Sequence, residues 1–221
     1  MAPKHIFHLL KWEKLPDILP RGNVYIIDEN QESEYTFSVR EGTECHLLRL
    51  GLTGTTSTKI CTEIEPNGIC TIDGIFLAEK TNVHMETSIA WDNAFGKVEL
   101  LCLARQKTDM KISANMSVVP WIRWFSAHVR QQNILLWGDA TIRGIPMLHV
   151  ASNEGNIWHS CTVTRIPKEH IFYLASHGMD RESADALILE WLIRKRLQCF
   201  TETEIYSTLQ EKIMRTLAEI S

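Results

Sequence analysis

The stretch that decides the fold of this 221-residue chain, residues 159–191, reads HSCTVTRIPKEHIFYLASHGMDRESADALILEW. It begins with a short β segment, and Pro167 then marks a turn. We expect Phe172-Tyr173-Leu174 to form a second apolar strand, which ends at a break in Ser176-His177-Gly178. From Asp180 onward the apolar residues recur every three or four positions, which predicts an amphipathic helix. The stretch therefore joins a strand-rich region to a helical one.

Upstream of this stretch, the chain consists of short segments in which apolar and polar side chains alternate. Such alternation over four to eight residues predicts half-buried strands. We expect strands at 34–40, 46–52, 98–103, 111–118, 133–137 and 161–166. Turn signals fall between them, at 41–43, 66–68, 73–74, 138–139 and 153–156. Strands without intervening helices indicate a sandwich, a barrel or a β-solenoid, and alternation does not separate these three.

The two ends of the chain have helical patterns. Residues 5–15 predict a short helix that Pro16 ends, so residues 1–22 form a short N-terminal segment ahead of a β core at 23–175. We expect a helical subdomain at 176–221, with one helix through Arg196 and a last helix opened by a capping box at 201–204. The apolar stripe of that last helix is compatible with core packing or with a docked partner.

Composition excludes several classes of function. The formal net charge is −4, and the one dense basic cluster, Arg194-Lys195-Arg196, lies in a predicted helix, so we expect no nucleic-acid partner. No apolar run approaches the ~20 residues that span a bilayer, and the N-terminus does not read as a signal peptide. We therefore expect a cytoplasmic protein without a membrane partner. Residues 51–59 only faintly resemble a phosphate loop and precede a predicted strand, so we expect no nucleotide bound by this chain.

Two loose histidine and glutamate pairs suggest a metal-dependent enzyme as an alternative function. His84 and Glu86 share one face of a predicted strand, and the spacing of His149 and Glu154 is compatible with a cupin, a β-barrel metal enzyme. The six cysteines include no Cys-x-x-Cys pair, and we expect reduced thiols. No Gly-x-Ser-x-Gly elbow is present. A third possibility is a β-solenoid module that binds a protein partner and no metal.

The motifs between about residues 139 and 193 resemble, in order and spacing, those of the SufB/SufD family, which comprises scaffold subunits of an iron–sulfur cluster assembly machine. Residues 138–148, GDATIRGIPML, resemble the family segment that ends in Pro-x-Leu. HSCTVTRI at 159–166 resembles His-(Gly or Glu)-Ala-Thr-x-x-x-Ile, and FYLASHG at 172–178 resembles Phe-Tyr-Leu-x-Ser-Arg-Gly. The resemblance is specific over roughly a quarter of the chain.

The resemblance implies a right-handed parallel β-helix with a C-terminal helical subdomain, acting as a scaffold and not as an enzyme. It implies a dimer formed through the β-helix, with either a SufB-like subunit or a second copy of this chain. It also implies that an ABC-type ATPase, SufC, docks on the helical part. SufB carries Glu after the conserved His, where this chain has Ser160, and has an upstream cysteine that this chain lacks between Cys102 and Cys161. The chain therefore looks SufD-like, in a short form.

The same resemblance implies that His159 holds iron or a nascent iron–sulfur cluster at the dimer interface, a role for which imidazole is suited. Cys161 lies two residues further on, so on a strand the two side chains share a face. We expect Cys161 to be either a second ligand or a buried core residue. The residues expected to contact the ATPase are Leu187, Ile188, Trp191, Ile205 and Leu209.

Overall fold

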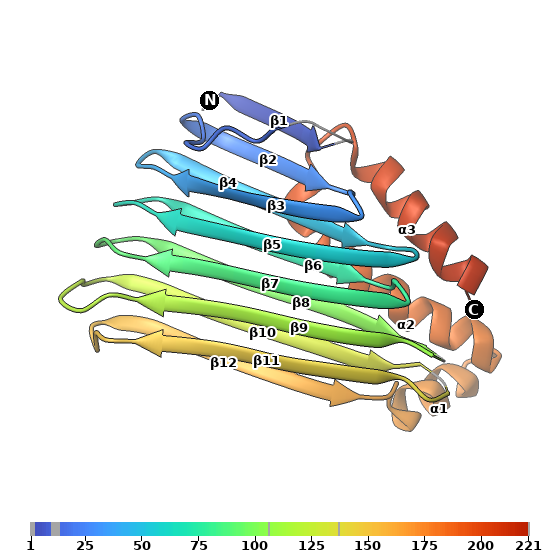
Figure 1. Cartoon of the computed structure of the whole chain (residues 1–221). Coiled ribbons are helices and arrows are strands. Elements are labelled where there is room, and N and C mark those ends of the chain that lie inside the picture. The colour runs from blue at the N-terminus through green and yellow to red at the C-terminus, as the bar shows by residue number, and fades with distance from the viewer. Residues whose placement is uncertain (1–2, 10–13, 106, 137, 221) are drawn as a thin grey trace.

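The computed structural model describes residues 3–9, 14–105, 107–136 and 138–220. Among the described residues, the strands lie between residues 4 and 164 and the helices follow them (Figure 1). In the described part of the chain, the strands are β1 (Lys4–Leu9), β2 (Gly22–Asp28), β3 (Glu32–Val39), β4 (Thr43–Gly51), β5 (Thr55–Ile64), β6 (Ile69–Phe76), β7 (Lys80–Ile89), β8 (Phe95–Ala104), β9 (Asp109–Val118), β10 (Phe125–Leu135), β11 (Thr141–Val150) and β12 (Gly155–Thr164). The helices are α1 (Lys168–Ser176), α2 (Arg181–Arg196), a 3-10 turn (Gln198–Phe200) and α3 (Tyr206–Ile220).

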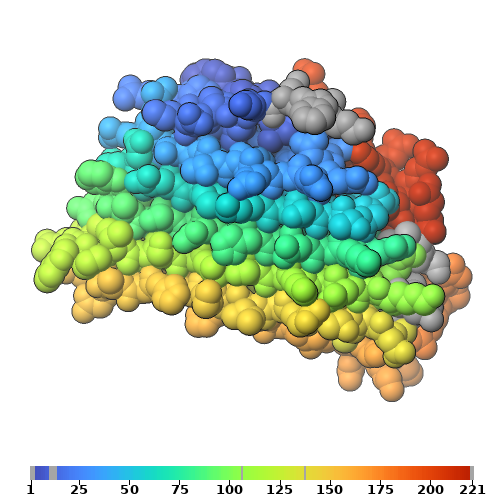
Figure 2. Space-filling model, in the orientation of Figure 1, coloured from blue at the N-terminus to red at the C-terminus, as the bar shows by residue number. Residues whose placement is uncertain are grey.

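The strands form two parallel sheets on opposite sides of one coil. Sheet A has the order β1-β2-β4-β6-β8-β10-β12, and sheet B has the order β11-β9-β7-β5-β3. From β2 onward, each strand lies in the other sheet from the strand before it, so every two strands complete one turn of the coil. The turns stack in chain order, as the colours of Figure 2 show from blue to gold. The fold is a parallel β-helix followed by helices, and the expected fold class is confirmed.

The interior of the coil is apolar because alternate residues of every strand point into it. On β4, Cys45 and Leu47 face the interior, whereas Leu48 and Leu50 face outward and belong to a second core under α2 and α3. Sheet A is therefore buried on both faces where the helices cover it, and its strands contain continuous apolar runs. The strands of sheet B have one face in solvent and keep strict alternation, as β5 does.

The helices pack on the outer face of sheet A, near the carboxyl ends of its strands (Figure 1). Helix α2 begins where the sequence predicts: the Asp180 carboxylate accepts a hydrogen bond from the Ser183 amide at 2.8 Å. At the other end of α2, Phe200 is fully buried and lies edge-on to the Tyr25 ring of β2. The helical part therefore shares a hydrophobic core with the β-helix.

Two expected elements have the wrong secondary structure. The predicted helix at 5–15 is wrong where it is described, because Lys4–Leu9 is a strand that pairs in parallel with β2, and residues 10–13 lie outside the described residues. The free backbone groups of the β2 edge decide this, because they are partners that a sequence pattern does not reveal. The predicted strand at 172–174 is also wrong, because these residues belong to α1. With no neighbouring strand to pair with, this segment satisfies its backbone groups as a helix.

Two further predictions, a turn at 73–74 and a capping box at 201–204, are also wrong. Gly74 lies inside β6 and not in a turn, and a Cβ built on it would come within 2.7 Å of Leu100 and of the Phe76 ring. The glycine therefore permits close packing in mid-strand. The capping box at 201–204 is wrong as well, because α3 begins at Tyr206. The hydroxyls of Thr201 and Thr203 donate to preceding carbonyls and do not cap a helix.

Candidate functional site

The coil ends at two strands, β11 and β12, and in the described structure each has a strand neighbour on one side only. β12 pairs with β10 and leaves its other edge open. Its sequence, GNIWHSCTVT, contains no Lys, Arg, Asp or Glu, which are the residues that usually protect an open edge. Ile157 and Val163 of β12 are exposed although they occupy positions that face the interior in earlier turns. This end of the β-helix is therefore an uncovered section through its apolar core.

His159 and Cys161 lie at this open end. In the parallel pairing of β10 with β12, His159 is opposite Val129 and Cys161 is opposite Gln131, and both of those partners are fully buried. Side chains of opposed residues in a parallel pair point to the same side, so the histidine and the cysteine share the interior face of β12. Both are exposed, because none of the described strands lies beyond β12 in sheet A. The expected shared face agrees with this register.

Two buried amides form a polar floor beneath Cys161. The Gln131 amide nitrogen donates to the Asn133 Oδ1 at 3.0 Å, and the Asn133 amide nitrogen lies 3.6 Å from the Cys161 Sγ. Gly144 of β11 leaves the room for this arrangement, because a Cβ there would lie 1.9 Å from the Gln131 nitrogen. Burial raises the pKa of the Cys161 thiol, and the hydrogen bond from Asn133 opposes that rise. Sequence reasoning missed both amides, although FSAHVRQQNIL puts them at inward positions of β10.

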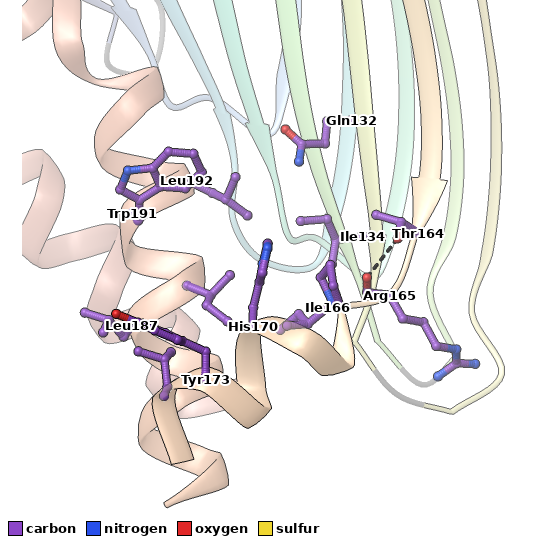
Figure 3. A pocket seen from close by; sticks show the side chains of 13 residues that line it. Gln132, Ile134, Thr164, Arg165, Ile166, His170, Tyr173, Leu187, Trp191 and Leu192 are labelled. Carbon is purple, nitrogen blue, oxygen red and sulfur yellow. Dashed lines mark hydrogen bonds between the residues drawn. The ribbon is translucent and has the colours of Figure 1, made fainter. Parts of the chain in front are cut away.

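A second feature lies at the helical part, where a groove of about 590 Å³ separates α1 and α2 from the carboxyl ends of β10 and β12. Figure 3 shows Tyr173, Leu187 and Trp191 of the two helices on one side, and Ile134 of β10 on the other. His170 projects between them. Leu187 is 44% exposed and Trp191 is 60% exposed. The lining is largely apolar, which suits the docking of another apolar surface.

Residues 65–190, more than half of the chain, match the family described as SUF system FeS cluster assembly, SufBD core domain. This chain belongs to the SufBD family. The match includes the open end with His159 and Cys161, and it reaches Leu187 in the groove. No curated protein matches the chain.

Membership of the SufBD family supports a role in iron–sulfur cluster assembly by the SUF system, whose SufBD members are assembly components. In the described part of this SufBD chain, no three His, Cys, Asp or Glu side chains gather as a metal site. His159 and Cys161 are the side chains of these types on the interior face of β12. None of the described helices is long and apolar enough to cross a membrane.

The alternative of a cupin-like enzyme is wrong for this SufBD chain, because the fold is a β-helix and the four residues do not converge. His84 and Glu86 lie in the middle of sheet B, whereas His149 aligns through Ser117 with Ser88. That alignment sets His149 about 13 Å along the strand direction from His84, at 3.3 Å per residue. Glu154 lies in a turn, where its carboxylate pairs with Arg123 at 3.5 Å.

The five residues expected to dock the ATPase divide into two groups in the SufBD structure. Leu187, Ile188 and Trp191 line the groove. Ile205 packs partly buried against the core under α3, and Leu209 is only 3% exposed in that core. Leu209 therefore stabilises the chain itself, and we leave it out of the docking surface.

A buried charge cluster holds the helical part of the SufBD chain against sheet A. Arg196, the last residue of α2, donates to the Glu99 carboxylate of β8 at 2.6 Å, and both groups are nearly out of reach of solvent. Asp73 of β6 lies beside this pair. Burial and the nearby Glu99 carboxylate together raise the pKa of the Asp73 carboxyl to about 7, although Arg196 and Lys97 act against the rise. The pH therefore sets the charge of this interface.

Proposed function

We propose that this chain is a scaffold subunit of a SUF-type iron–sulfur cluster assembly complex, SufD-like in a short form, and not itself an enzyme. The observation that carries the proposal is His159, an exposed imidazole on the interior face of the last strand of a SufBD β-helix. Imidazole and thiolate are both iron ligands, and Cys161 supplies the second of these on the same face. Iron or the nascent cluster is the cargo, held transiently between this chain and a partner.

The partner pairs with the open end of the β-helix. An edge strand without charged residues, with exposed Ile157 and Val163, favours the addition of a strand from another chain. Sheet B is less suited to this role, because its own edge strand contains Pro146, which cannot donate a ladder hydrogen bond. The partner is a SufB-like subunit or a second copy of this chain, and it completes the ligand set.

The ABC-type ATPase, SufC, docks on the groove between α1 and α2. Leu187 and Trp191 are one turn apart on α2 and present apolar side chains to solvent. An exposed apolar surface of this kind on a folded chain supports an interaction with another protein.

The first experiment tests whether the chain forms a complex with the ATPase and the SufB-like subunit. The protein is mixed with the ATPase and the SufB-like subunit of its own source, and the assembly is analysed by pull-down and size. Leu187→Asp with Trp191→Ala is expected to abolish ATPase binding, because both side chains are exposed and the fold does not depend on them. Trp121→Ala, which removes a 92% exposed tryptophan outside the groove, is the matched control. A complex that survives the double substitution contradicts docking at the groove.

The second experiment measures the amount of iron bound to the paired complex. The paired complex is reconstituted with ferrous iron and sulfide, and His159→Ala is expected to lose most of the bound iron while pairing remains intact. His149→Ala removes an exposed histidine from the last strand of sheet B and serves as the control. Equal iron in all three proteins contradicts the role of His159. It favours the remaining alternative, a β-solenoid module that binds a protein partner and no metal.

A further inference from the structure

The groove between α1 and α2 has the pattern of a site for one helix of another protein. Leu187 and Trp191 project from successive turns of α2, and Tyr173 projects from α1 toward the same space (Figure 3). A groove of this shape takes the apolar face of an amphipathic helix, whose anchors also recur at three- and four-residue intervals. The apolar lining therefore predicts apolar contact residues on the bound helix, but it does not predict which residues of that helix flank them.

The charges around the groove specify the flanking residues. Among the described residues that line it, Arg165 is the one permanently ionised side chain, and no carboxylate contributes. In Figure 3, Arg165 lies at the opposite side of the groove from Trp191, and its side chain extends outward, away from His170. Beside Trp191 lies a second cation, because the Lys195 ammonium is 5.7 Å from the centre of the indole ring. Arg165 and Lys195 therefore lie at two sides of the apolar lining.

The carboxylate of Glu190 on α2 does not cancel these cations. Glu190 is paired with Arg194 at 2.6 Å on the same helix, and it does not line the groove. Glu169, in the first turn of α1, also lies outside the lining. A ligand helix in the groove thus meets positive charge at its margins. Opposite charges at the margin of an interface select the partner and speed its association.

We propose that the groove binds an amphipathic helix of the partner protein in which Asp or Glu residues flank the apolar anchors. This inference rests on the proposed function to the extent that the SUF ATPase is the expected owner of the helix. Leu187 and Trp191 provide the affinity, and Arg165 and Lys195 discriminate against a helix with basic flanks.

Two synthetic helical peptides test the proposal on the full-length protein. They share one apolar face, with leucines at positions 1, 4, 5 and 8 of the repeat, and they carry either glutamates or lysines beside it. Binding is followed by tryptophan fluorescence, and Trp191→Phe identifies the contribution of the groove. We expect the glutamate peptide to bind about tenfold more tightly than the lysine peptide at low salt, with the difference shrinking as salt rises.

Charge-reversal variants locate the effect. Lys195→Glu and Arg165→Glu are expected to weaken the glutamate peptide severalfold each, and to improve binding of the lysine peptide. Lys111→Glu makes the same charge change on the exposed face of sheet B and is expected to leave both peptides unaffected. Equal binding of the two peptides, or no binding of the glutamate peptide, overturns the proposal.

The ATPase distinguishes this inference from the proposed function. If the glutamate peptide binds as expected but the ATPase does not, the inference stands and docking of the ATPase fails. If the ATPase binds through Leu187 and Trp191 but is insensitive to Lys195→Glu and Arg165→Glu, the proposed function stands and the acidic flanks are refuted.

Discussion

Replacement of Asp73 by asparagine is expected to stabilise the protein, by an amount that depends on pH. Asp73 is 4% exposed, and burial, together with the nearby Glu99 carboxylate, raises the pKa of its carboxyl to about 7 in the folded chain even though Arg196 opposes the rise. In the unfolded chain that carboxyl has its ordinary pKa of about 4. The folded state therefore holds the proton more tightly, which favours folding below pH 4 and ceases to do so as the pH rises to 7. Asparagine imitates the protonated carboxyl at every pH.

The magnitude follows from the difference of about three pKa units. Each unit is worth about 1.4 kcal/mol, so the advantage of Asp73→Asn over the wild type grows to roughly 4 kcal/mol across this window. Between pH 4.5 and pH 7.5 the difference in unfolding free energy is expected to increase by about 3 kcal/mol. For a chain of this size that corresponds to a Tm difference that widens by roughly 6–12 °C.

The assay is thermal and urea unfolding of both proteins at half-unit steps from pH 4.5 to pH 8, followed by circular dichroism. Asp17→Asn, at an exposed position, reports what the loss of a surface carboxylate does by itself. A difference between Asp73→Asn and the wild type that is constant across this range refutes the reasoning. It would mean that Asp73 is ionised at low pH in the folded chain and that its burial is offset by water or by Arg196.

Three further substitutions test the packing that positions the two candidate sites. Arg196→Met is expected to cost about 3 kcal/mol in urea unfolding, because it leaves Glu99 buried without its closest cation, and adding Glu99→Leu is expected to recover most of the loss. Gly144→Ala is expected to destabilise the chain by roughly 1–3 kcal/mol, because the new Cβ meets the Gln131 amide, and a simultaneous Gln131→Ala should remove that cost. Phe200→Ala is expected to cost about 3–5 kcal/mol of unfolding free energy by calorimetry, and a cost below about 1 kcal/mol would mean that the helices do not share a core with sheet A.

Much of the fold was predictable from local patterns. The alternation at 111–118 predicts a strand because a half-buried strand repeats every two residues whatever its neighbours are, and β9 occupies that range. Helix α2 was predictable for a similar reason, since the Asp180 cap and the helical period both act within a few residues. The candidate ligand His159 was found through the family resemblance, whereas Cys161 was suggested by its two-residue spacing from His159, which puts the two side chains on one face of a strand.

Other features depend on partners that are distant in the sequence. Lys4–Leu9 becomes a strand because β2 offers it a free edge, and residues 172–174 become helical because no strand is left to pair with them. The polar floor under Cys161 needs Gln131, Asn133 and Gly144, which the coil brings together from two strands. The burial of Leu209 and the exposure of Leu187 likewise depend on how the helices lie on sheet A.

The sequence by itself determined which segments have strand or helix periodicity and which family the chain resembles. It also identified His159 and Cys161 as candidate ligands on one strand. Only the tertiary structure decided that those side chains lie at an uncovered end of the coil, that a groove with cationic margins separates α1 and α2 from the carboxyl ends of β10 and β12, and that Asp73 and Arg196 share a buried interface. The physical reason is the range of the forces involved. The side-chain periodicity of a strand or helix and the capping of a helix depend on residues a few positions apart. Exposure, desolvation and charge pairing depend instead on which segments, distant in the sequence, exclude water from a given side chain.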